Sequence, residues 1–159
     1  MLGNRTTVEF AKVSDVTEIG DLSRKYIEHD LGWKYTPEKL KRIIKNRTIN
    51  VVVARKGNKL VGFGIMTYHE EHANLDLLAV KIIYRRRGIG KQIVKWLEEV
   101  ALTAGIFNIF VQARKINNDA IKFYKKLGYE IIDEKSGYYR GQETGVIMSK
   151  NIRQMINAT

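Results

Sequence analysis

The chain has 159 residues, 44% of them hydrophobic and 28% charged, a composition typical of a soluble globular protein that can bury a core. It contains no cysteine, which excludes disulfides, thiolate metal sites and a cysteine nucleophile and fits a reducing compartment. The three histidines have no metal-ligand spacing, no apolar run reaches the roughly 18 residues of a membrane span, and no signal peptide is apparent. We therefore expect a cytoplasmic protein without a bound metal or a membrane partner.

The first half of the chain carries signals for one strand, two helices and a hairpin. Ser14 or Asp15 offers an N-cap for the first helix, and Thr36-Pro37-Glu38 has the cap, proline and acid that start a second one. Lys56-Gly57-Asn58-Lys59 is typical of a short hairpin turn. The predicted elements are a strand over 8–12, a helix from 15 to about 29, a helix from 36, and strands over 49–55 and 60–69.

The second half alternates strands and helices. Helical spacing of apolar residues predicts a helix that Gly105 ends, and Gly128 closes a shorter one. The predicted elements are a strand over 74–80, a helix over 88–104, a strand over 106–113, a helix over 118–126, and strands over 129–133 and 146–149. We expect a mixed α/β fold with helices on both faces of a central sheet. We also expect a single domain over 1–159, with a core of about 7–150 and a fraying tail over 151–159.

A basic glycine turn, Tyr84 to Lys91, separates the strand over 74–80 from the following helix. Gly88 and Gly90 leave the backbone accessible, so their N–H groups and those of the first helical turn can point at one anion. The sequence fits neither G-x-x-x-x-G-K-[ST] nor G-x-G-x-x-G, and what remains is Arg-x-x-Gly-x-Gly. The pattern indicates a site for a phosphorylated cofactor, and a solvated basic loop that caps an ordinary helix is the alternative.

The net charge of +11 falls largely in two clusters. The cluster from Lys81 to Lys95 lies on the glycine turn, where a polyanionic cofactor accounts for it. The cluster from Lys34 to Arg47 lies on a predicted surface helix, and we interpret it as a solvated face. We therefore expect no nucleic-acid partner.

Two motifs together resemble the GNAT superfamily of acetyl-coenzyme A-dependent N-acetyltransferases. The first consists of Leu78-Ala79-Val80 and the turn from Arg85 to Lys91, and the second is the run from Asn117 to Tyr129, with its Phe123-Tyr124 pair and Leu127-Gly128-Tyr129. The likeness extends from about Val8 to Ser149. Its C-terminal half, including Gly137-Tyr138-Tyr139, is most similar to the branch that acetylates protein N-termini, of the ribosomal-protein alanine type.

The resemblance implies a GNAT-type mixed sheet of about six or seven strands and acetyl-CoA as the cofactor. Backbone groups of Leu78 and Val80 would pair with the pantetheine arm, and an amide near Val80 would polarise the thioester carbonyl. Asn117 would hold the pantetheine, and Tyr124 would return a proton to the departing thiolate; core packing is the alternative for Tyr124. The implied cofactor-binding residues are Leu78, Ala79, Val80, Arg85, Arg86, Arg87, Gly88, Ile89, Gly90, Lys91, Asn117 and Tyr124.

The general base is the point where the sequence departs from the superfamily. Relatives often carry carboxylates where this chain has Asn74 and Gln112, and an amide cannot accept a proton usefully at neutral pH. The remaining candidates are Asp76, on the same strand face as Asn74, and His72, which titrates in the useful range. Glu143, beside the Tyr138-Tyr139 loop, is a third. Each of them has a purely structural alternative, such as an ion pair, a strand cap or a solvated loop position.

The acceptor is predicted to be a primary amine that attacks the thioester directly. An N-terminal α-amine, with a pKa near 8, needs less help from a base than a lysine does. Trp33, Tyr35, Gln112, Tyr138 and Tyr139 are the predicted acceptor contacts, although Trp33 fits an anchor between two helices equally well. Two alternatives stay open: a small amine acceptor (polyamine, amino acid or aminoglycoside), and a coenzyme A-binding module with little catalysis. A homodimer is also open.

Overall fold

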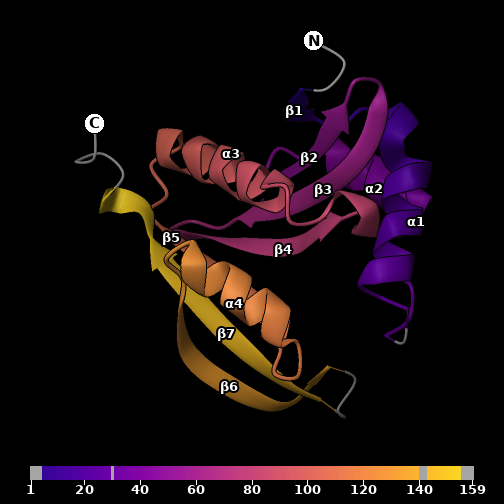
Figure 1. Cartoon of the computed structure of the whole chain (residues 1–159). Coiled ribbons are helices and arrows are strands. Elements are labelled where there is room, and N and C mark those ends of the chain that lie inside the picture. The colour runs from indigo at the N-terminus through magenta and orange to yellow at the C-terminus, as the bar shows by residue number, and fades with distance from the viewer. Residues whose placement is uncertain (1–4, 30, 140–142, 155–159) are drawn as a thin grey trace. The chain divides into compact units, whose positions relative to one another are not determined.

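The computed structural model describes residues 5–29, 31–139 and 143–154 (Figure 1). The chain divides into two compact units, Met1–Thr67 with Asp76–Glu99, and Tyr68–Leu75 with Val100–Thr159, which we call the first and the second unit. Seven strands follow one another in the order β1-β2-β3-β4-β5-β7-β6, and strand β4 (His72–Val80) contributes residues to both units. The expected mixed α/β fold with a sheet of about seven strands is confirmed.

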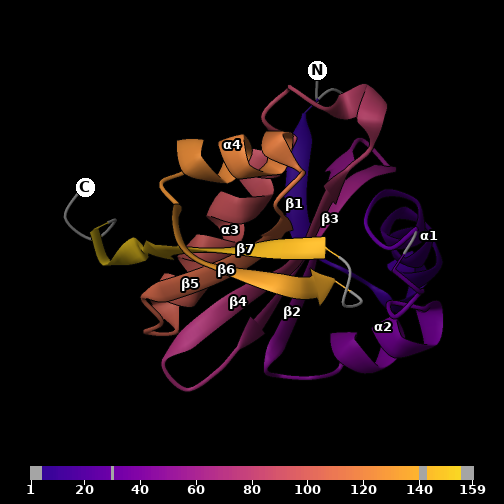
Figure 2. The ribbon, with the colours of Figure 1, turned by 90° about the horizontal axis from the view of Figure 1, so that it is seen from below.

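The first unit is built on a β-meander with helices on both of its faces. Its elements are β1 (Thr6–Phe10), α1 (Val16–Tyr26), α2 (Pro37–Ile44), β2 (Ile49–Lys56), β3 (Lys59–Tyr68) and the N-terminal part of α3 (Ile89–Thr103). Strands β1, β2 and β3 pair antiparallel, as the hairpin turn predicted. Phe63 and Ile65 of β3 face the core under α1 and α2, whereas α3 covers the opposite face (Figures 1 and 2).

Two glycines of β3 explain how closely α3 lies on the sheet. A Cβ atom on Gly62 would come 2.8 Å from the carbonyl oxygen of Ala79, and one on Gly64 would come 2.8 Å from the Ile93 side chain. Such distances are shorter than real Cβ contacts, so the backbone of β3 needs glycine at both positions. Because Ile93 lies one turn into α3, the two glycines fix the start of the helix against the end of β4.

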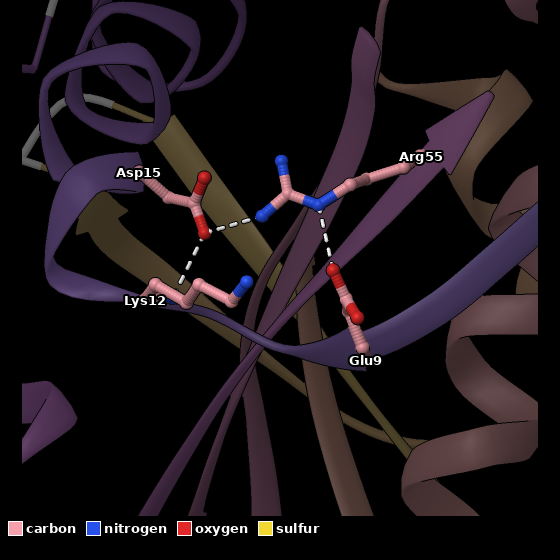
Figure 3. Close-up of polar contacts among 4 residues, drawn as sticks. All are labelled: Glu9, Lys12, Asp15 and Arg55. Carbon is pink, nitrogen blue, oxygen red and sulfur yellow. Dashed lines mark hydrogen bonds and ion pairs between the residues drawn. The ribbon is translucent and has the colours of Figure 1, made fainter. Parts of the chain in front are cut away.

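A polar cluster ties the entry of α1 to the strands (Figure 3). Arg55 of β2 forms ion pairs of 2.7 Å with Glu9 of β1 and with Asp15, whose carboxylate also accepts the backbone N–H of Lys12 at 2.8 Å. The hydrogen bonds from Arg55 to these carboxylates raise the pKa of its guanidinium further above the ordinary value. The short 3-10 helix before α1 (Val13–Asp15) is thereby held on the edge of the meander.

The second unit contains β5 (Asn108–Arg114), α4 (Asn118–Lys126), β6 (Glu130–Tyr139) and β7 (Glu143–Asn151). The first residues of β4 pair with β5 in parallel, and β7 pairs antiparallel with both β5 and β6. Helix α4 has the predicted bounds. The chain leaves it through Gly128, whose φ of +98° is a left-handed conformation that favours glycine.

Several predicted bounds of helices and strands are wrong. Helix α1 ends at Tyr26 rather than near His29, because Ile27 and Glu28 both donate their N–H to the Ser23 carbonyl and the chain turns away. Strand β1 lies two residues earlier than predicted, β5 starts at Asn108, and β6 and β7 are longer than predicted. The described part of β6 is mostly exposed, so it lacks the apolar alternation by which strands are recognised. The prediction that the chain frays from residue 151 is wrong for Ile152, which is buried and donates its N–H to the Phe107 carbonyl.

Within the described residues, no helix combines the length and the apolar character that crossing a membrane requires.

Candidate active site

The turn between β4 and α3 presents its backbone to solvent. Arg86 and Gly88 both have left-handed backbones, with φ of +63° and +80°, and a Cβ atom on Gly88 would meet no other atom within 4 Å. Helix α3 begins at Ile89, and Gly88 accepts its first hydrogen bond from Gln92 at 3.0 Å. The N–H groups of the first helical turn have no acceptor inside the helix. An anion can therefore approach Gly88, Ile89, Gly90 and Lys91 along the backbone.

The cations of the turn do not all have the same environment. Arg85 donates its Nε–H to the carbonyl of Val80 at 2.9 Å and stacks over the Tyr26 ring at 5.1 Å, so this side chain braces the end of β4. Arg87 lies 5.6 Å from the centre of the Tyr84 ring. Arg86, Arg87 and Lys91 are exposed, whereas Ile89 is buried and anchors the helix start in the core.

Strand β4 offers backbone groups next to this turn. Among the described residues, it pairs with β5 over four residue pairs, from His72 with Asn108 to Leu75 with Val111. Leu78, Ala79 and Val80 come after the last of these pairs. Leu78 and Val80 are half-buried, and Ala79 is buried in the core under α1 and α2. The carbonyl of Val80 accepts a hydrogen bond from the Arg85 side chain.

Asn117 and Tyr124, both in the second unit, belong to one helix. The Asn117 side chain is the N-cap of α4 and accepts the N–H of Ala120 at 3.1 Å, a contact that holds its oxygen in place. Tyr124 is buried, with its ring packed edge-on against Phe123 and Tyr129 at 5.1 and 5.7 Å. Phe123 is half-buried. The roles of Asn117 and Tyr124 stay predictions.

The two amides at the usual carboxylate positions are bonded to each other. The Nδ2 of Asn74 donates to Gln112 at 3.1 Å, and the Nε2 of Gln112 donates back to Asn74 at 2.8 Å. Two carboxylates so placed would repel each other, whereas two amides satisfy both partners. His72, on the same strand as Asn74, stacks on His69 at 4.6 Å and meets the edge of Phe110 at 5.2 Å.

Asp76 lies in the first unit, half-buried, and accepts a hydrogen bond from the Thr67 hydroxyl. It also acts on Tyr35, a predicted acceptor contact from the connection between α1 and α2. Burial, and then the charges of Asp76 and Glu28, raise the pKa of Tyr35 to about 12. The phenol is therefore neutral at physiological pH and can donate a hydrogen bond.

Glu28, which no sequence motif singled out, is buried and organises this connection. Its carboxylate accepts the Ser23 hydroxyl at 2.8 Å and the backbone N–H groups of Lys34 and Tyr35 at 2.9 and 3.2 Å. A carboxylate is the only side chain that can accept three such donors at once. A helix end is usually read as solvated, so only the spacing between Glu28 and the aromatic pair could have drawn attention to it.

The other predicted acceptor residues have mixed surroundings. The indole N–H of Trp33 donates to the Gly20 carbonyl at 3.2 Å, which matches the interpretation as an anchor between helices. Tyr138 is exposed and covers Gly145, and the side chain of Tyr139 lies outside the described part of the structure. One carboxylate oxygen of Glu143 is buried without a hydrogen bond, although Arg114 lies 3.4 Å away.

Comparison with known proteins identifies the family. The model of the Acetyltransferase (GNAT) family matches residues 17–129, well over half of the chain, and the chain therefore belongs to this family. The fold and the turn at the start of α3 agree with that membership.

Two curated relatives and one solved structure indicate what the chain is similar to. It is 34% identical over 101 residues to the N-terminal acetyltransferase B complex catalytic subunit NAA20 of Arabidopsis thaliana, covering 59% of this chain and 57% of that protein. It is 27% identical over 95 residues to the ribosomal protein bS18-alanine N-acetyltransferase of Salmonella typhimurium, covering 58% and 64%. The crystal structure of the ribosomal-protein-S18-alanine N-acetyltransferase from Escherichia coli superposes with a TM-score of 0.80 at 20% identity, covering 93% and 94%, a likeness of fold. The chain spans about half the length of the curated relatives it matches.

Proposed function

We propose that this chain is an acetyl-CoA-dependent N-acetyltransferase that transfers acetyl directly to a primary amine, the N-terminal amine of a protein or peptide. The observation that carries the proposal is the turn before α3, in which Arg86 and Gly88 take left-handed backbones and present the first helical turn to an anion. Membership of the GNAT family and the N-terminal acetyltransferases among the relatives support it. We propose that residues 1–159 act as one such domain, in the cytoplasm.

The residues present fit a phosphorylated cofactor. The space beside Gly88 is open, and exposed Arg86, Arg87 and Lys91 supply positive charge around the helix start. The N–H groups from Arg86 to Lys91 would bind the pyrophosphate, and Leu78 and Val80 would pair with the pantetheine arm through their backbones. When bound, acetyl-CoA supplies an acetyl group activated as a thioester. The N–H of Val80 would donate to the thioester carbonyl oxygen and stabilise the negative charge that develops there.

Two proton transfers complete the proposed chemistry. The ammonium of the acceptor must lose a proton before it attacks, and Asp76 is our first choice as base, acting through water and oriented by the Thr67 hydroxyl. His72 and Glu143 are the remaining candidates. The Tyr124 Oη–H would give its proton to the departing thiolate, while Asn117 would hold the pantetheine. Neither a cysteine nor an evident activated serine is available to form an acyl-enzyme, so direct transfer is the simpler course.

The Asn74–Gln112 pair favours a second candidate function. Because each amide satisfies the other, the usual carboxylate positions hold no group that accepts a proton, which would suit a coenzyme A-binding module with little turnover. A small amine as acceptor is the other alternative.

One assay separates these functions. Release of the coenzyme A thiol from acetyl-CoA is followed with N-terminal peptides, then with polyamines, amino acids and aminoglycosides, for the wild type and for Tyr124→Phe. Our proposal predicts turnover with peptides that the substitution lowers. Binding of coenzyme A without turnover on any panel would replace our proposal by the binding module, and turnover confined to small amines would replace the acceptor.

A further inference from the structure

The predicted acceptor residues Trp33 and Tyr35 lie in a basic stretch of the first unit. Residues 24–47 contain eight Lys or Arg and three Asp or Glu, a net charge of +5 within a total of +11. Of the three acidic side chains, Glu28 is buried and bonded to Ser23 and to two backbone N–H groups. The exposed side chains of this stretch are therefore mostly basic.

Cations stand directly on the two aromatic rings. The guanidinium of Arg24 lies 5.0 Å from the centre of the Trp33 ring, and the ammonium of Lys39 lies 4.5 Å from the centre of the Tyr35 ring. Arg24 also lines a surface hollow with Asp21, Lys25 and His29. A ligand that contacts Trp33 and Tyr35 is therefore also close to the positive charges of Arg24 and Lys39.

A negative charge also acts on Tyr35. Burial and then the negative charge of Asp76 raise the pKa of the Tyr35 phenol, so a carboxylate that can attract a cationic amine acts on this ring. Arg24 and Lys39, over the Trp33 and Tyr35 rings, carry the opposite charge. Farther along α2, Lys41, Arg42 and Lys45 are exposed and extend the basic surface.

We propose that the acceptor is an acidic polypeptide segment, with a cationic N-terminal amine followed by several carboxylate side chains that this basic surface attracts. The inference rests on the proposed function and names its substrate class. The same surface repels polycations, so it disfavours polyamine and aminoglycoside acceptors. Complementary charges of this kind act mainly on association, and their effect weakens as salt is added.

The test compares peptides that share their first residues and differ in the segment that follows, which is either acidic (Glu and Asp) or isosteric and neutral (Gln and Asn). We expect kcat/KM to be about tenfold higher for the acidic peptide at low salt, through KM, and the difference to vanish at about 0.5 M salt. The combined variant Lys41→Gln, Arg42→Gln, Lys45→Gln should lose most of this preference and keep its activity on the neutral peptide. The matched control Lys122→Gln, Lys125→Gln, Lys126→Gln removes three exposed charges from α4 and should keep the preference.

Equal kcat/KM for both peptides, or the same loss in both variants, would overturn the inference and leave the proposed function intact. If neither peptide is turned over, the proposed function fails, and direct binding of dye-labelled peptides to the full chain decides the inference alone. Tighter binding of the acidic peptide, weakened only by the α2 variant, would support it. Binding of a short single-stranded RNA in preference to the acidic peptide would overturn it.

Discussion

The turn between β4 and α3 and the connection between α1 and α2 form their sites by different means. In the turn, we propose that backbone N–H groups bind the cofactor, and the glycines that leave room for it can be recognised from the sequence. In the connection, the buried carboxylate of Glu28 holds the backbone of Lys34 and Tyr35, and no local motif in the sequence indicates this contact. A site made of backbone N–H groups depends little on which side chains surround it. A site made of side chains depends on the particular residues of this chain. The turn therefore suits a cofactor that many related enzymes share, and the connection suits an acceptor particular to this chain.

The largest expected effect concerns the proton donor. Tyr124→Phe should lower kcat about 100-fold, because the thiolate then leaves without a proton, and should leave the Kd for coenzyme A unchanged. Tyr129→Phe, on the ring beside it, is the matched control and should keep its rate. An unchanged kcat in Tyr124→Phe would return this residue to the role of a core tyrosine. Calorimetry for binding and thiol release for kcat make the measurement.

The turn is tested by a pair of glycine substitutions. Gly88→Ala should weaken binding of coenzyme A about tenfold, because alanine at a φ of +80° is strained and the turn must shift. Gly105 has a φ of +79° and equally open surroundings, so Gly105→Ala introduces the same strain outside the turn. Calorimetric titration of both variants should show weaker binding in Gly88→Ala alone. Equal weakening in both would mean that general destabilisation, and not the turn, sets the affinity.

A substitution in the connection should affect the acceptor KM and leave the affinity for coenzyme A unchanged. In Glu28→Gln, one amide N–H₂ faces donors that the carboxylate accepted, so the protein should lose about 1–3 kcal/mol of unfolding free energy. We expect the acceptor KM to rise several-fold, while the Kd for coenzyme A stays unchanged. Glu38→Gln, at an exposed position of α2, is the control. If the Kd for coenzyme A rose as much as the acceptor KM, the two regions would not be separable.

The smallest effect is a pH dependence of stability. Tyr35 has a pKa of about 12, above its ordinary value of 10, so its contribution to stability is fully present below pH 10 and is lost as the pH rises toward 12. Tyr35→Phe should therefore flatten the fall in unfolding free energy over this window. Chemical denaturation at several pH values measures it, with exposed Tyr138→Phe as the control. An unaltered slope in Tyr35→Phe would contradict the buried, anion-flanked placement of the phenol.

The sequence was most informative where local rules decide the structure. Helix α4 was predicted with its bounds because Gly128, which closes it, is a local signal; the structure adds the cap by Asn117. Strand β6 was predicted far too short, because an exposed edge strand depends on its pairing with β7 and not on its own pattern. The Asn74–Gln112 bond and the contacts of Glu28 join residues whose neighbourhood only the fold creates. Motifs therefore predicted the glycine turn between β4 and α3, whose role in anion binding stays a prediction, and tertiary contacts supplied the rest.

The central claim is that acetyl reaches an N-terminal α-amine. The direct test is mass spectrometry of a peptide that carries a free N-terminus and an internal lysine, incubated with acetyl-CoA and the full chain. The account predicts a single acetyl group on the α-amine, with none on the lysine. An acetyl group on the lysine, or an unmodified peptide beside acetylated small amines, would contradict it.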